Sequence, residues 1–400
     1  MTKATLENIP RAELRGRRVL VRADLNVPLG AGQITDDTRI RETIPTLRLL
    51  RDAGARTVVM SHLGRPQGPD PTCSLRHAAD RLGELMGGTV RFQPTLIGAE
   101  TETAVHALRD GEVLVLENTR FEPGETKNDP GLARALADLG DLFVNDAFGS
   151  AHRAHASTTG VAEEVRRRGG KAVSGLLMEK ELDFLSRLLC DPARPFVTIL
   201  GGAKVSGKVD VIRAMLPRVD RLLVGGAMAN TFFRALGLDA GASLVDEDRI
   251  DLCREILREA GDKLVLPVDA VVARRIEDDA PTRTVPRDSV PPGDRIADIG
   301  PATRQLFAGL LSDARTVLWN GPMGVFEKAV FREGTVAVAR AVAAATDQGA
   351  LTVVGGGDSA AALDAVGMSD RIGHVSTGGG ASLEFLAGEQ LPGVVALSER

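Results

Sequence analysis

Short apolar runs alternate with amphipathic segments along most of the chain. Runs rich in Val, Leu and Ile predict strands buried on both faces. We expect such strands over residues 18–22, 57–60, 113–116, 141–145, 196–200, 221–224, 264–266, 270–273, 316–319 and 351–354. Helical spacing of apolar positions predicts helices over residues 37–53, 75–86, 130–138, 178–190, 207–215, 248–260, 302–312, 333–347 and 358–365. The pattern therefore predicts an α/β protein with two doubly wound domains, whose parallel sheets are covered by helices.

A domain boundary is expected near residues 165–195. The segment 166–171 (ArgArgArgGlyGlyLys) is polar, and residues 176–189 then show helical spacing until AspPro at 191–192 ends the helix. This helix either connects two sheets or belongs to the surface of one domain, and the spacing fits both. The charged stretch 274–298 contains four prolines and predicts a surface excursion within the second half.

The composition excludes several classes of protein. A net charge of −5 without a basic stripe, one Trp and no Tyr argue against a nucleic-acid partner. The three cysteines (Cys73, Cys190 and Cys253) are far apart, so neither a zinc cluster nor a disulfide framework is expected. The N-terminus has no apolar signal core, and no apolar stretch approaches eighteen residues. We expect a reduced, cytoplasmic protein of two domains without a membrane partner.

Four apolar runs in the second half end in glycines, at residues 198–204, 222–227, 352–359 and 375–380. The run 352–359 (ThrValValGlyGlyGlyAspSer) leads into a predicted helix, whose first N–H groups are free to bind a phosphate. Its glycines could equally serve only a tight turn, but four such turns favour a phosphate-binding edge. The motif also fits a loose dinucleotide pattern; however, no carboxylate follows the next strand at 377–380, which disfavours a nicotinamide site.

Two lysines stand in the first of these glycine turns. The stretch 202–209 (GlyAlaLysValSerGlyLysVal) is one residue short of a phosphate-binding P-loop, because Val209 stands where a Ser or Thr is needed. Lys204 directly follows a strand that ends in two glycines, where a long cation can reach a ligand at the carboxyl edge of the sheet. The alternative is an ordinary solvated lysine.

The first half carries four basic side chains that follow three of its predicted strands. They are His62 and Arg65 in SerHisLeuGlyArgPro, Arg120 in GluAsnThrArgPhe, and Arg153 in AlaHisArgAlaHis. Each alone is more often a salt-bridged surface residue, but together they predict an anion pocket at one edge of the sheet. Asp24 and Asn26 in AspLeuAsnValPro suit the hydroxyls of a small ligand, or simply form a turn before Pro28. Arg39 stands near a helix start, where the dipole disfavours a cation, and this hints at a ligand.

These two groups of residues suit phosphoryl transfer. That reaction needs mainly positioning and charge neutralisation, and no Ser-His-Asp triad or paired-carboxylate signature stands out in the sequence. A protein with an anion pocket in one half and phosphate-binding turns in the other is suited to bring two phosphorylated molecules together.

Eight strings resemble the signatures of the phosphoglycerate kinase family, in that family's order and nearly from end to end. They are AspLeuAsnValPro (24–28), SerHisLeuGlyArgPro (61–66), LeuGluAsnThrArgPhe (116–121), AspAlaPheGlySerAlaHisArgAlaHis (146–155), GlyGlyAlaLysValSerGlyLys (201–208), TrpAsnGlyProMetGlyValPheGlu (319–327), GlyGlyGlyAspSer (355–359) and SerThrGlyGlyGlyAlaSer (376–382). The resemblance implies two Rossmann-like domains with parallel sheets, joined by a hinge helix. Residues 1–172 would bind 3-phosphoglycerate with the tail 386–400 packed back on them, 173–192 would form the helix, and 193–385 would bind the nucleotide.

The resemblance also implies roles for individual residues. The substrate-binding residues would be Asp24, Asn26, Arg39, His62, Arg65, Arg120 and Arg153, the last four at the phosphate. The nucleotide-binding residues would be Lys204, Lys208, Asn320, Glu327, Gly356, Gly357, Asp358 and Ser359, with Glu327 on the ribose and Asp358 on Mg²⁺. Arg39, Lys204 and Gly379 would be catalytic. Ala23, Ser150 and Gly207 depart from the residues that are frequent in the family, and none of these departures removes a charge needed for transfer.

The activity implied is reversible Mg²⁺-dependent transfer between ATP and the carboxylate of 3-phosphoglycerate, as in glycolysis and gluconeogenesis. We expect a monomer, direct in-line transfer and a hinge closure, with hinges near residues 166–190 and 376–385. Two rival hypotheses are a ligand sensor that binds without transferring phosphate, and an NAD-dependent dehydrogenase. The retained Arg39, Lys204 and Asp358 argue against the first, and the missing ribose-binding acid argues against the second.

Overall fold

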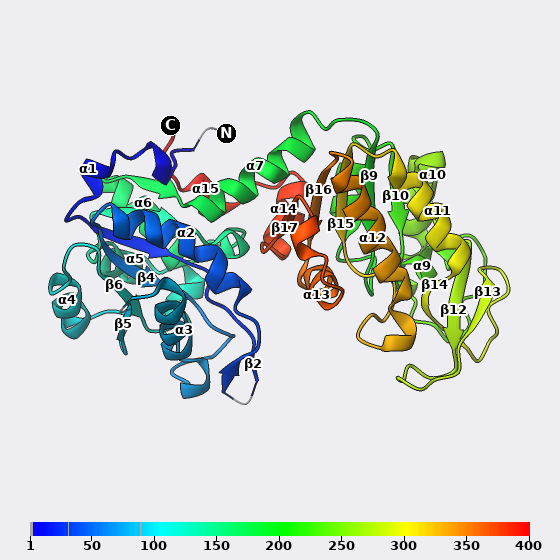
Figure 1. Ribbon diagram of the computed structural model, residues 1–400, viewed down its shortest axis with the longest axis horizontal. Coiled ribbons are helices and arrows are strands. Elements are labelled where there is room, and N and C mark those ends of the chain that lie inside the picture. Colours follow the sequence, from blue (N-terminus) through cyan, green and yellow to red (C-terminus); the bar gives the residue numbers. More distant parts are fainter. Residues whose placement is uncertain (1–2, 31, 89) are drawn as a thin grey trace. The chain divides into compact units, whose positions relative to one another are not determined.

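The computed structural model describes residues 3–30, 32–88 and 90–400, which form two compact units (Figure 1). Unit 1 comprises the residues up to Asp183 together with Gln390–Arg400, and unit 2 comprises Phe184–Glu389. The change from one unit to the other falls inside helix α7 (Leu176–Cys190). Each unit contains its own parallel sheet, which confirms the predicted α/β class.

Unit 1 is built on a six-stranded sheet in which every neighbouring pair is parallel. Its order is β5 (Val90–Gln93), β6 (Val113–Leu116), β4 (Arg56–Met60), β1 (Arg18–Arg22), β7 (Leu142–Asn145) and β8 (Ala172–Ser174). A small antiparallel pair, β2 (Leu29–Gly30) and β3 (Gln33–Ile34), lies outside this sheet. All carboxyl ends of the six strands therefore meet at one edge.

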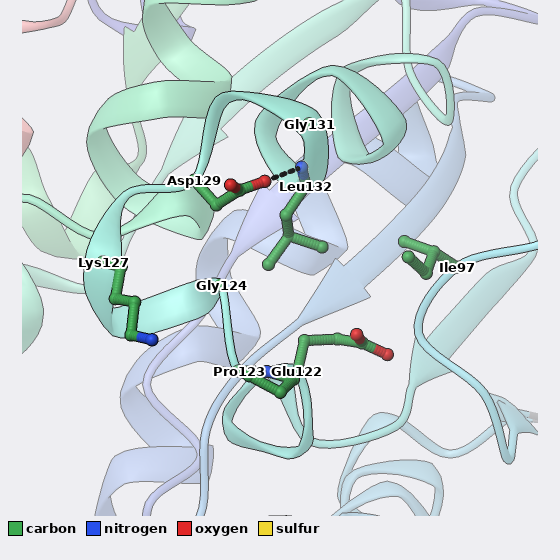
Figure 2. A pocket seen from close by; sticks show the side chains of 8 residues that line it. All are labelled: Ile97, Glu122, Pro123, Gly124, Lys127, Asp129, Gly131 and Leu132. Atoms are coloured by element: carbon green, nitrogen blue, oxygen red, sulfur yellow. Dashed lines mark hydrogen bonds between the residues drawn. The ribbon is translucent and has the colours of Figure 1, made fainter.

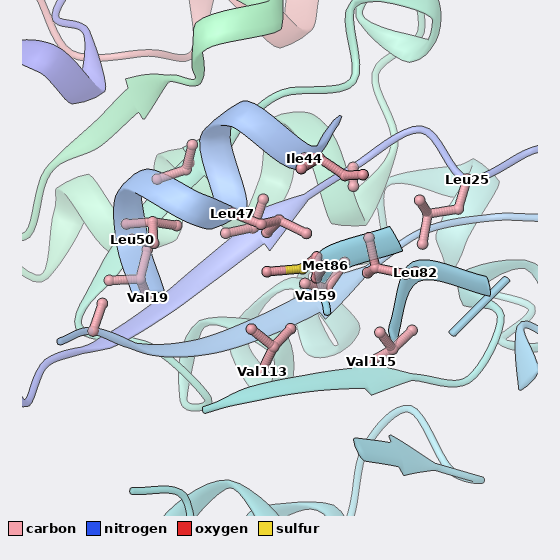
Figure 3. Packing of buried hydrophobic residues seen from close by; sticks show 14 of the residues in the cluster. Val19, Leu25, Ile44, Leu47, Leu50, Val59, Leu82, Met86, Val113 and Val115 are labelled. Carbon is pink, nitrogen blue, oxygen red and sulfur yellow. The ribbon is translucent and has the colours of Figure 1, made fainter. Parts of the chain in front are cut away.

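Alternation along the strands divides the core of unit 1 between the two faces of its sheet. Val19 packs in a cluster with Leu47 and Leu82 (Figure 3), whereas the next residue, Leu20, belongs to a separate cluster with Leu136 and Val165. Successive side chains of a strand point to opposite faces, so both faces need a helical cover. The helices of unit 1 are α1 (Arg11–Leu14), α2 (Thr38–Asp52), α3 (Arg76–Met86), α4 (Ala99–His106), α5 (Pro130–Ala137), α6 (Val161–Arg167) and α15 (Pro392–Val395).

The last eleven residues of the chain complete unit 1. The N–H of Ala4 donates to the carbonyl of Ser398 (2.9 Å), and the N–H of Gly393 donates to the carbonyl of Ala151 (2.9 Å). Leu397 is fully buried in the same cluster as Leu20. The tail thus supplies both backbone partners and core side chains to a unit whose other residues end at Asp183.

Unit 2 contains a second six-stranded sheet, also parallel throughout. Its order is β11 (Leu264–Val265), β10 (Arg221–Val224), β9 (Phe196–Leu200), β15 (Thr316–Asn320), β16 (Leu351–Gly355) and β17 (His374–Ser376). The helices of this unit are α8 (Val209–Met215), α9 (Met228–Ala235), α10 (Ile250–Ala260), α11 (Pro301–Ser312), α12 (Glu333–Asp347), α13 (Gly357–Ala365) and α14 (Gly380–Leu386). Ile199 and Trp319 pack with Phe307 and Val342 on one face of the sheet.

Most of the stretch 274–298 is exposed, which agrees with the predicted surface excursion, but it also forms strands that the sequence analysis did not predict. It contributes β13 (Arg283–Pro286) and most of β14 (Arg295–Ile299), which pair antiparallel with β12 (Asp269–Ala273) on either side. The prolines did not prevent pairing, because Pro286 is the last residue of an edge strand and the N–H of the next residue, Arg287, donates to the carbonyl of Val268 (3.1 Å). The charged composition reflects an exposed strand at the edge of this small sheet.

The turns at the carboxyl ends of β9 and β10 pack backbone against backbone, and Gly226 makes this possible. Its φ is +66°, and a Cβ there would lie 2.5 Å from the nitrogen and 2.7 Å from the oxygen of Gly202. We expect Gly226→Ala to lower the free energy of unfolding by about 3 kcal/mol, from left-handed strain and a backbone clash together. Gly237→Ala is the matched control, because Gly237 has a φ of +81° with open space around it, and should cost about 1 kcal/mol. Equal losses in urea unfolding would show that the close approach is unimportant.

Candidate functional site

Polar loops follow four adjacent strands of the sheet in unit 1. Asp24 follows β1, His62 follows β4, Arg120 follows β6 and Arg153 follows β7, and these strands are neighbours in the order β6-β4-β1-β7. Because parallel strands share one carboxyl edge, the loops lie together at that edge. The sequence analysis predicted one shared edge for four basic residues; in the structure they follow three of these strands rather than four, because His62 and Arg65 share the loop after β4.

Asp24 and Arg39 form an ion pair at this edge. Arg39 is the second residue of α2, and its Nη1 donates to Oδ2 of Asp24 (2.8 Å). Asp24 is almost fully buried; burial opposes its charge, yet the positive charges of Arg39 and Arg22 hold the pKa of the carboxyl below its ordinary value. The pair therefore keeps a carboxylate and a guanidinium in fixed positions beside the loops that follow β1 and β4.

Asn26 connects the loops after β1 and β4. Its N–H donates to Oδ1 of Asp24 (3.2 Å), which is the turn chemistry considered from the sequence. Its Oδ1 accepts the N–H of Gly64 (2.8 Å), next to Arg65. Both the turn and the contact at the edge are therefore present, and the Asn26 amide NH₂ group makes no hydrogen bond among residues 3–30, 32–88 and 90–400.

His62 is a neutral group in this cluster. Its Nδ1 lies 3.1 Å from Nη2 of Arg22, and a guanidinium can only donate, so Nδ1 accepts. Burial, followed by the positive charge of Arg22, lowers the pKa of His62 to about 3. Grouping His62 with the arginines in the sequence suggested a cation; the structure instead shows a neutral imidazole that can donate from Nε2.

The remaining arginines carry positive charge that their neighbours leave largely uncompensated. The Nε of Arg120 is buried without a hydrogen-bond partner among the described residues. Burial lowers the pKa of Arg120, Glu125 opposes that shift, and Arg65 adds to it. The guanidinium groups of Arg65 and Arg153 are exposed, and neither forms a hydrogen bond or ion pair within the described part of the chain. An anionic ligand would satisfy all three.

Two residues beneath this edge escaped the sequence analysis. Arg22, the last residue of β1, is only 1% exposed; its Nε donates to Oγ of Ser157 (2.8 Å) and its Nη1 to the carbonyl of Ala23 (2.5 Å). Glu125 is fully buried and accepts the Ser157 hydroxyl (2.5 Å). An arginine inside the apolar strand RVLVR was a signal for Arg22, because buried charges are rare unless paired. Nothing local marked Glu125.

The glycine turns of unit 2 meet at the carboxyl edge of the second sheet. The N–H of Gly201 donates to the carbonyl of Asn320 (2.9 Å), and the N–H of Gly202 donates to that of Pro322 (3.0 Å). The N–H of Gly226 donates to the carbonyl of Met323 (3.1 Å). These hydrogen bonds join the backbones of the loops after β9, β10 and β15. The sequence analysis predicted that the glycine turns after β9 and β10 lie at the same edge of the sheet.

Lys204 and Lys208 lie in the same loop with different surroundings. Lys208 donates through Nζ to the carbonyl of Asn320 (3.1 Å) and to its side-chain oxygen. Burial lowers the pKa of Lys208 to about 8, and the carboxylate of Asp358 opposes that shift. Lys204 is exposed and makes no hydrogen bond or ion pair with the described residues, so its ammonium group is available to a ligand.

Helix α13 begins at the glycines that follow β16. Gly356 precedes the helix with a φ of +93°, and the first intrahelical bond runs from the N–H of Ala360 to the carbonyl of Gly356 (3.0 Å). The N–H groups of Gly357, Asp358 and Ser359 precede that bond and suit a phosphate. The Ser359 hydroxyl is buried and accepts the N–H of Gly321 (2.7 Å), so its side chain braces the β15 loop.

Two further predicted residues lie apart from these hydrogen bonds. Glu327 is exposed in the loop after β15. Gly379 has a φ of +52° and immediately precedes α14, after β17. Glu327 thus follows β15 and Gly379 follows β17, so both lie beyond the carboxyl ends of strands of the second sheet.

The donor set suits a metal ion carried by a ligand rather than one held by protein groups alone. The described residues contain no group of three or more His, Cys, Asp or Glu side chains placed to hold a metal. Asp358 is a single exposed carboxylate at the start of α13. Mg²⁺ is commonly held by one or two carboxylates together with substrate phosphates and water, which fits this arrangement.

A separate cavity of about 370 Å³ lies in unit 1 between the loop before α4 and the start of α5 (Figure 2). Glu122 and Lys127 line it, together with Asp129, whose Oδ1 accepts the N–H of Leu132 (2.9 Å). No residue predicted from the sequence as a site residue lines this cavity. Within the described residues, the structure also contains no helix with the length and apolar character needed to cross a membrane.

Comparisons with known proteins agree in their result. A model of the family described as phosphoglycerate kinase matches residues 9–389. The phosphoglycerate kinase of Moorella thermoacetica is 54% identical over 404 residues, covering all of both chains. That of Thermus thermophilus is 56% identical and covers 96% of this chain and 97% of its own. Two solved phosphoglycerate kinase structures are similar over 98% of both chains, from Coxiella burnetii (39% identity, TM-score 0.86) and Pyrococcus horikoshii OT3 (35%, 0.87).

Proposed function

Because the chain belongs to the phosphoglycerate kinase family, we propose that it transfers a phosphoryl group reversibly between ATP and the carboxylate of 3-phosphoglycerate. The products in this direction are ADP and 1,3-bisphosphoglycerate. The observation that carries the proposal is the division of polar groups between the two units. Guanidinium groups at the edge of one sheet, and N–H groups with a lysine at the edge of the other, have no partners among the residues that the structure describes. This division suits one anionic ligand in each unit.

In unit 1, we assign the 3-phosphoglycerate to the loops after β1, β4, β6 and β7. Its phosphate would bind Arg65, Arg120 and Arg153, whose guanidinium groups have no hydrogen-bond partner in the described part of the chain, with His62 donating from Nε2. Its carboxylate and hydroxyl would bind near Arg39, Asp24 and Asn26, which are already held in place by hydrogen bonds.

In unit 2, we assign the nucleotide phosphates to the start of α13 and the two lysines of the β9 loop. The N–H groups of Gly357, Asp358 and Ser359 would bind phosphate oxygens, and Lys208, held by Asn320, would contact them from the buried side. Glu327 would bind the ribose hydroxyls. When bound, Mg²⁺ held by Asp358 and the phosphates supplies charge neutralisation at those oxygens.

The proposed chemistry is direct in-line transfer. A carboxylate oxygen of the glycerate forms a bond to the γ-phosphorus of ATP while the bond to the bridging oxygen breaks, and ADP leaves with that electron pair. Arg39 and Lys204 neutralise the equatorial oxygens during this step, together with the backbone N–H groups around Gly379. No side chain is phosphorylated.

Transfer requires the two ligands to meet although their binding groups belong to different units. We therefore retain the proposal of a hinge closure at residues 166–190 and 376–385, which would also exclude water and limit ATP hydrolysis. The enzyme is proposed to act as a cytoplasmic monomer in glycolysis and gluconeogenesis, with no nucleic-acid or membrane partner.

The test is ATP consumption by the purified protein with Mg²⁺, in the presence and absence of 3-phosphoglycerate. We expect turnover that depends on 3-phosphoglycerate, with 1,3-bisphosphoglycerate detected by a coupled reduction. Binding of both ligands in calorimetry without any transfer would instead favour a ligand sensor. Absence of binding by 3-phosphoglycerate would reject the proposal.

The lowered pKa of Lys208 predicts that nucleotide binding takes up protons. With a pKa of about 8, this lysine is about half protonated at pH 8 in the free protein. A nearby phosphate favours the charged form and raises the pKa, so Mg-ADP should bind with proton uptake that is largest above pH 8, between the pKa values of the free and bound protein, and vanishes below about pH 6. Calorimetry in two buffers of different ionisation heat measures it. Lys208→Met should abolish the uptake, and an unchanged uptake would assign the proton to another group.

A further inference from the structure

We infer that Glu125 is a positioning residue of the 3-phosphoglycerate site, which acts through Ser157 and Arg22 to fix the orientation and the proton position of His62. The inference rests on the proposed function only for the identity of the ligand. It concerns a hydrogen-bonded chain of Glu125, Ser157, Arg22 and His62, whose members come from four separate segments of unit 1.

The first link orients a hydroxyl group. Glu125 is fully buried; its Oε2 accepts the N–H of Ser157 (2.9 Å) and its Oε1 accepts the Ser157 hydroxyl (2.5 Å). A carboxylate can only accept, so the hydroxyl proton of Ser157 must point toward Glu125. The lone pairs of the same oxygen are then free to accept the Nε–H of Arg22 (2.8 Å).

The second link orients the guanidinium group of Arg22. This group is planar, and two of its nitrogens are held, Nε by Ser157 and Nη1 by the carbonyl of Ala23. With those two contacts made, the direction of Nη2 is determined, and it lies 3.1 Å from Nδ1 of His62. The position of Arg22 therefore depends on the oxygen that Glu125 has oriented.

The third link places the proton on the imidazole of His62. Arg22 has donors only, so Nδ1 of His62 accepts and the proton of the neutral ring is on Nε2. Asp24, Arg39 and Arg120 also act on this imidazole, and the net result is the low pKa of about 3 described above. The neutral ring thus offers an Nε2–H donor to the anionic ligand, and no protonation of the imidazole is needed before the ligand binds.

The charge of Glu125 has its own part in this arrangement. It acts on Arg22, Arg120 and His155, and it opposes the lowering of the pKa that burial causes in all three. Buried guanidinium groups need such a counter-charge, because burial without one is costly. A neutral amide at position 125 would remove the counter-charge and could also donate to Ser157, reversing the direction of the first hydrogen bond.

The ordinary alternative is that Glu125 only holds two backbone segments together. Its contact with the N–H of Ser157 does join the loop before α5 to the helical turn Ala156–Gly160. On that alternative, substitution of Glu125 lowers the free energy of unfolding but leaves the orientation and the proton position of the His62 ring unchanged. The two hypotheses therefore differ in what they predict for the His62 ring.

The experiment uses Glu125→Gln and Ser157→Ala in the full-length protein, with Glu122→Gln as the matched control. Glu122 is a partly exposed residue in the same segment, and it lines the cavity in Figure 2. Its backbone carbonyl accepts the N–H of Glu125 (3.1 Å), a bond that the substitution keeps, and among the described residues its carboxylate makes no hydrogen bond to Glu125, Ser157, Arg22 or His62. We expect KM for 3-phosphoglycerate to rise about tenfold in both variants, with KM for Mg-ATP unchanged. In ¹⁵N spectra of the ligand-free protein, wild-type His62 should be protonated on Nε2 alone, and both variants should populate the Nδ1–H form.

Each outcome decides the matter. An unchanged His62 spectrum in a folded variant overturns the inference, even if KM rises, because the effect would then be structural. If Glu125→Gln fails to fold, Ser157→Ala gives the same test. A wild-type protein inactive on 3-phosphoglycerate would reject the proposed function, while the ligand-free spectra would still judge the role of Glu125.

Discussion

Replacing Lys204 by alanine is expected to lower kcat by about 10²–10³-fold, the loss seen when one preorganised charge-stabilising group is removed. Lys204 has no partner among the described residues, so its removal exposes no unpaired group and leaves the loop after β9 intact. Lys208 and the N–H groups at the start of α13 remain to bind the nucleotide. The Kd for Mg-ADP should therefore change by less than about tenfold. Steady-state kinetics and calorimetry measure the two quantities.

The matched control for this variant is Lys263→Ala. Lys263 immediately precedes β11, at the amino edge of the same sheet, where its Nζ donates to the carbonyl of Leu216 (3.0 Å). We expect its kcat to stay near the wild-type value. If both lysine variants lost activity equally, or if Lys204→Ala lost only affinity for nucleotide, the assignment of Lys204 to the transferred group would be wrong.

Arg39→Ala is expected to lower kcat/KM for 3-phosphoglycerate by about 10²–10³-fold. The substitution removes a cation from the proposed reacting carboxylate. The substitution also removes the ion-pair partner of Asp24, whose side chain is only 5% exposed. The unpaired carboxylate then lies where the anionic ligand is proposed to bind. Because Arg39 belongs to unit 1, KM for Mg-ATP should not change.

Arg41→Ala separates this effect from a general loss of charge on α2. Arg41 lies on the same helix and pairs through Nε with Asp37 (2.6 Å) on an exposed surface. Removing a surface pair costs little, about 0–1 kcal/mol of stability, and should leave kcat/KM unchanged. Comparable losses in the two arginine variants would argue against a ligand contact at Arg39.

The inner strands of both parallel sheets were predictable from the sequence, and so was the edge strand β11, whereas the edge strands β5, β8 and β17 were not. Predicted strands and helices all occur with ends shifted by two residues at most, because a strand covered on both faces needs a continuous apolar run. At the edges, β5 reads ValArgPheGln and β17 reads HisValSer, which are short and mixed in polarity. Helices α4 and α6 were missed as well, and α4 is only weakly amphipathic. Edge elements take their structure from neighbours that lie far away in the sequence.

The place of the polar residues was predictable, but their ionisation and partners were not. A residue after a parallel strand must lie at the shared carboxyl edge, and this placed His62, Arg120 and Lys204 correctly from strand positions alone. The neutrality of His62 comes first from burial and then from the charge of Arg22, and Arg22 itself is bonded to Ser157, which lies 135 positions from it in the sequence. The bond of the Ser359 hydroxyl to Gly321 likewise comes from packing between loops rather than from any motif.

The tail contacts of unit 1 have a consequence for biosynthesis. On the ribosome, residues 3–183 emerge first, but the partners that Ser398 and Leu397 provide are translated only after the whole of unit 2. The second unit is a single uninterrupted segment and can form its core as soon as it has left the exit tunnel. The nascent first unit must wait until residues 390–400 have been translated, with the cluster around Leu20 and Phe143 still open to solvent or to a chaperone. In this protein the segment made first is therefore the last to be finished.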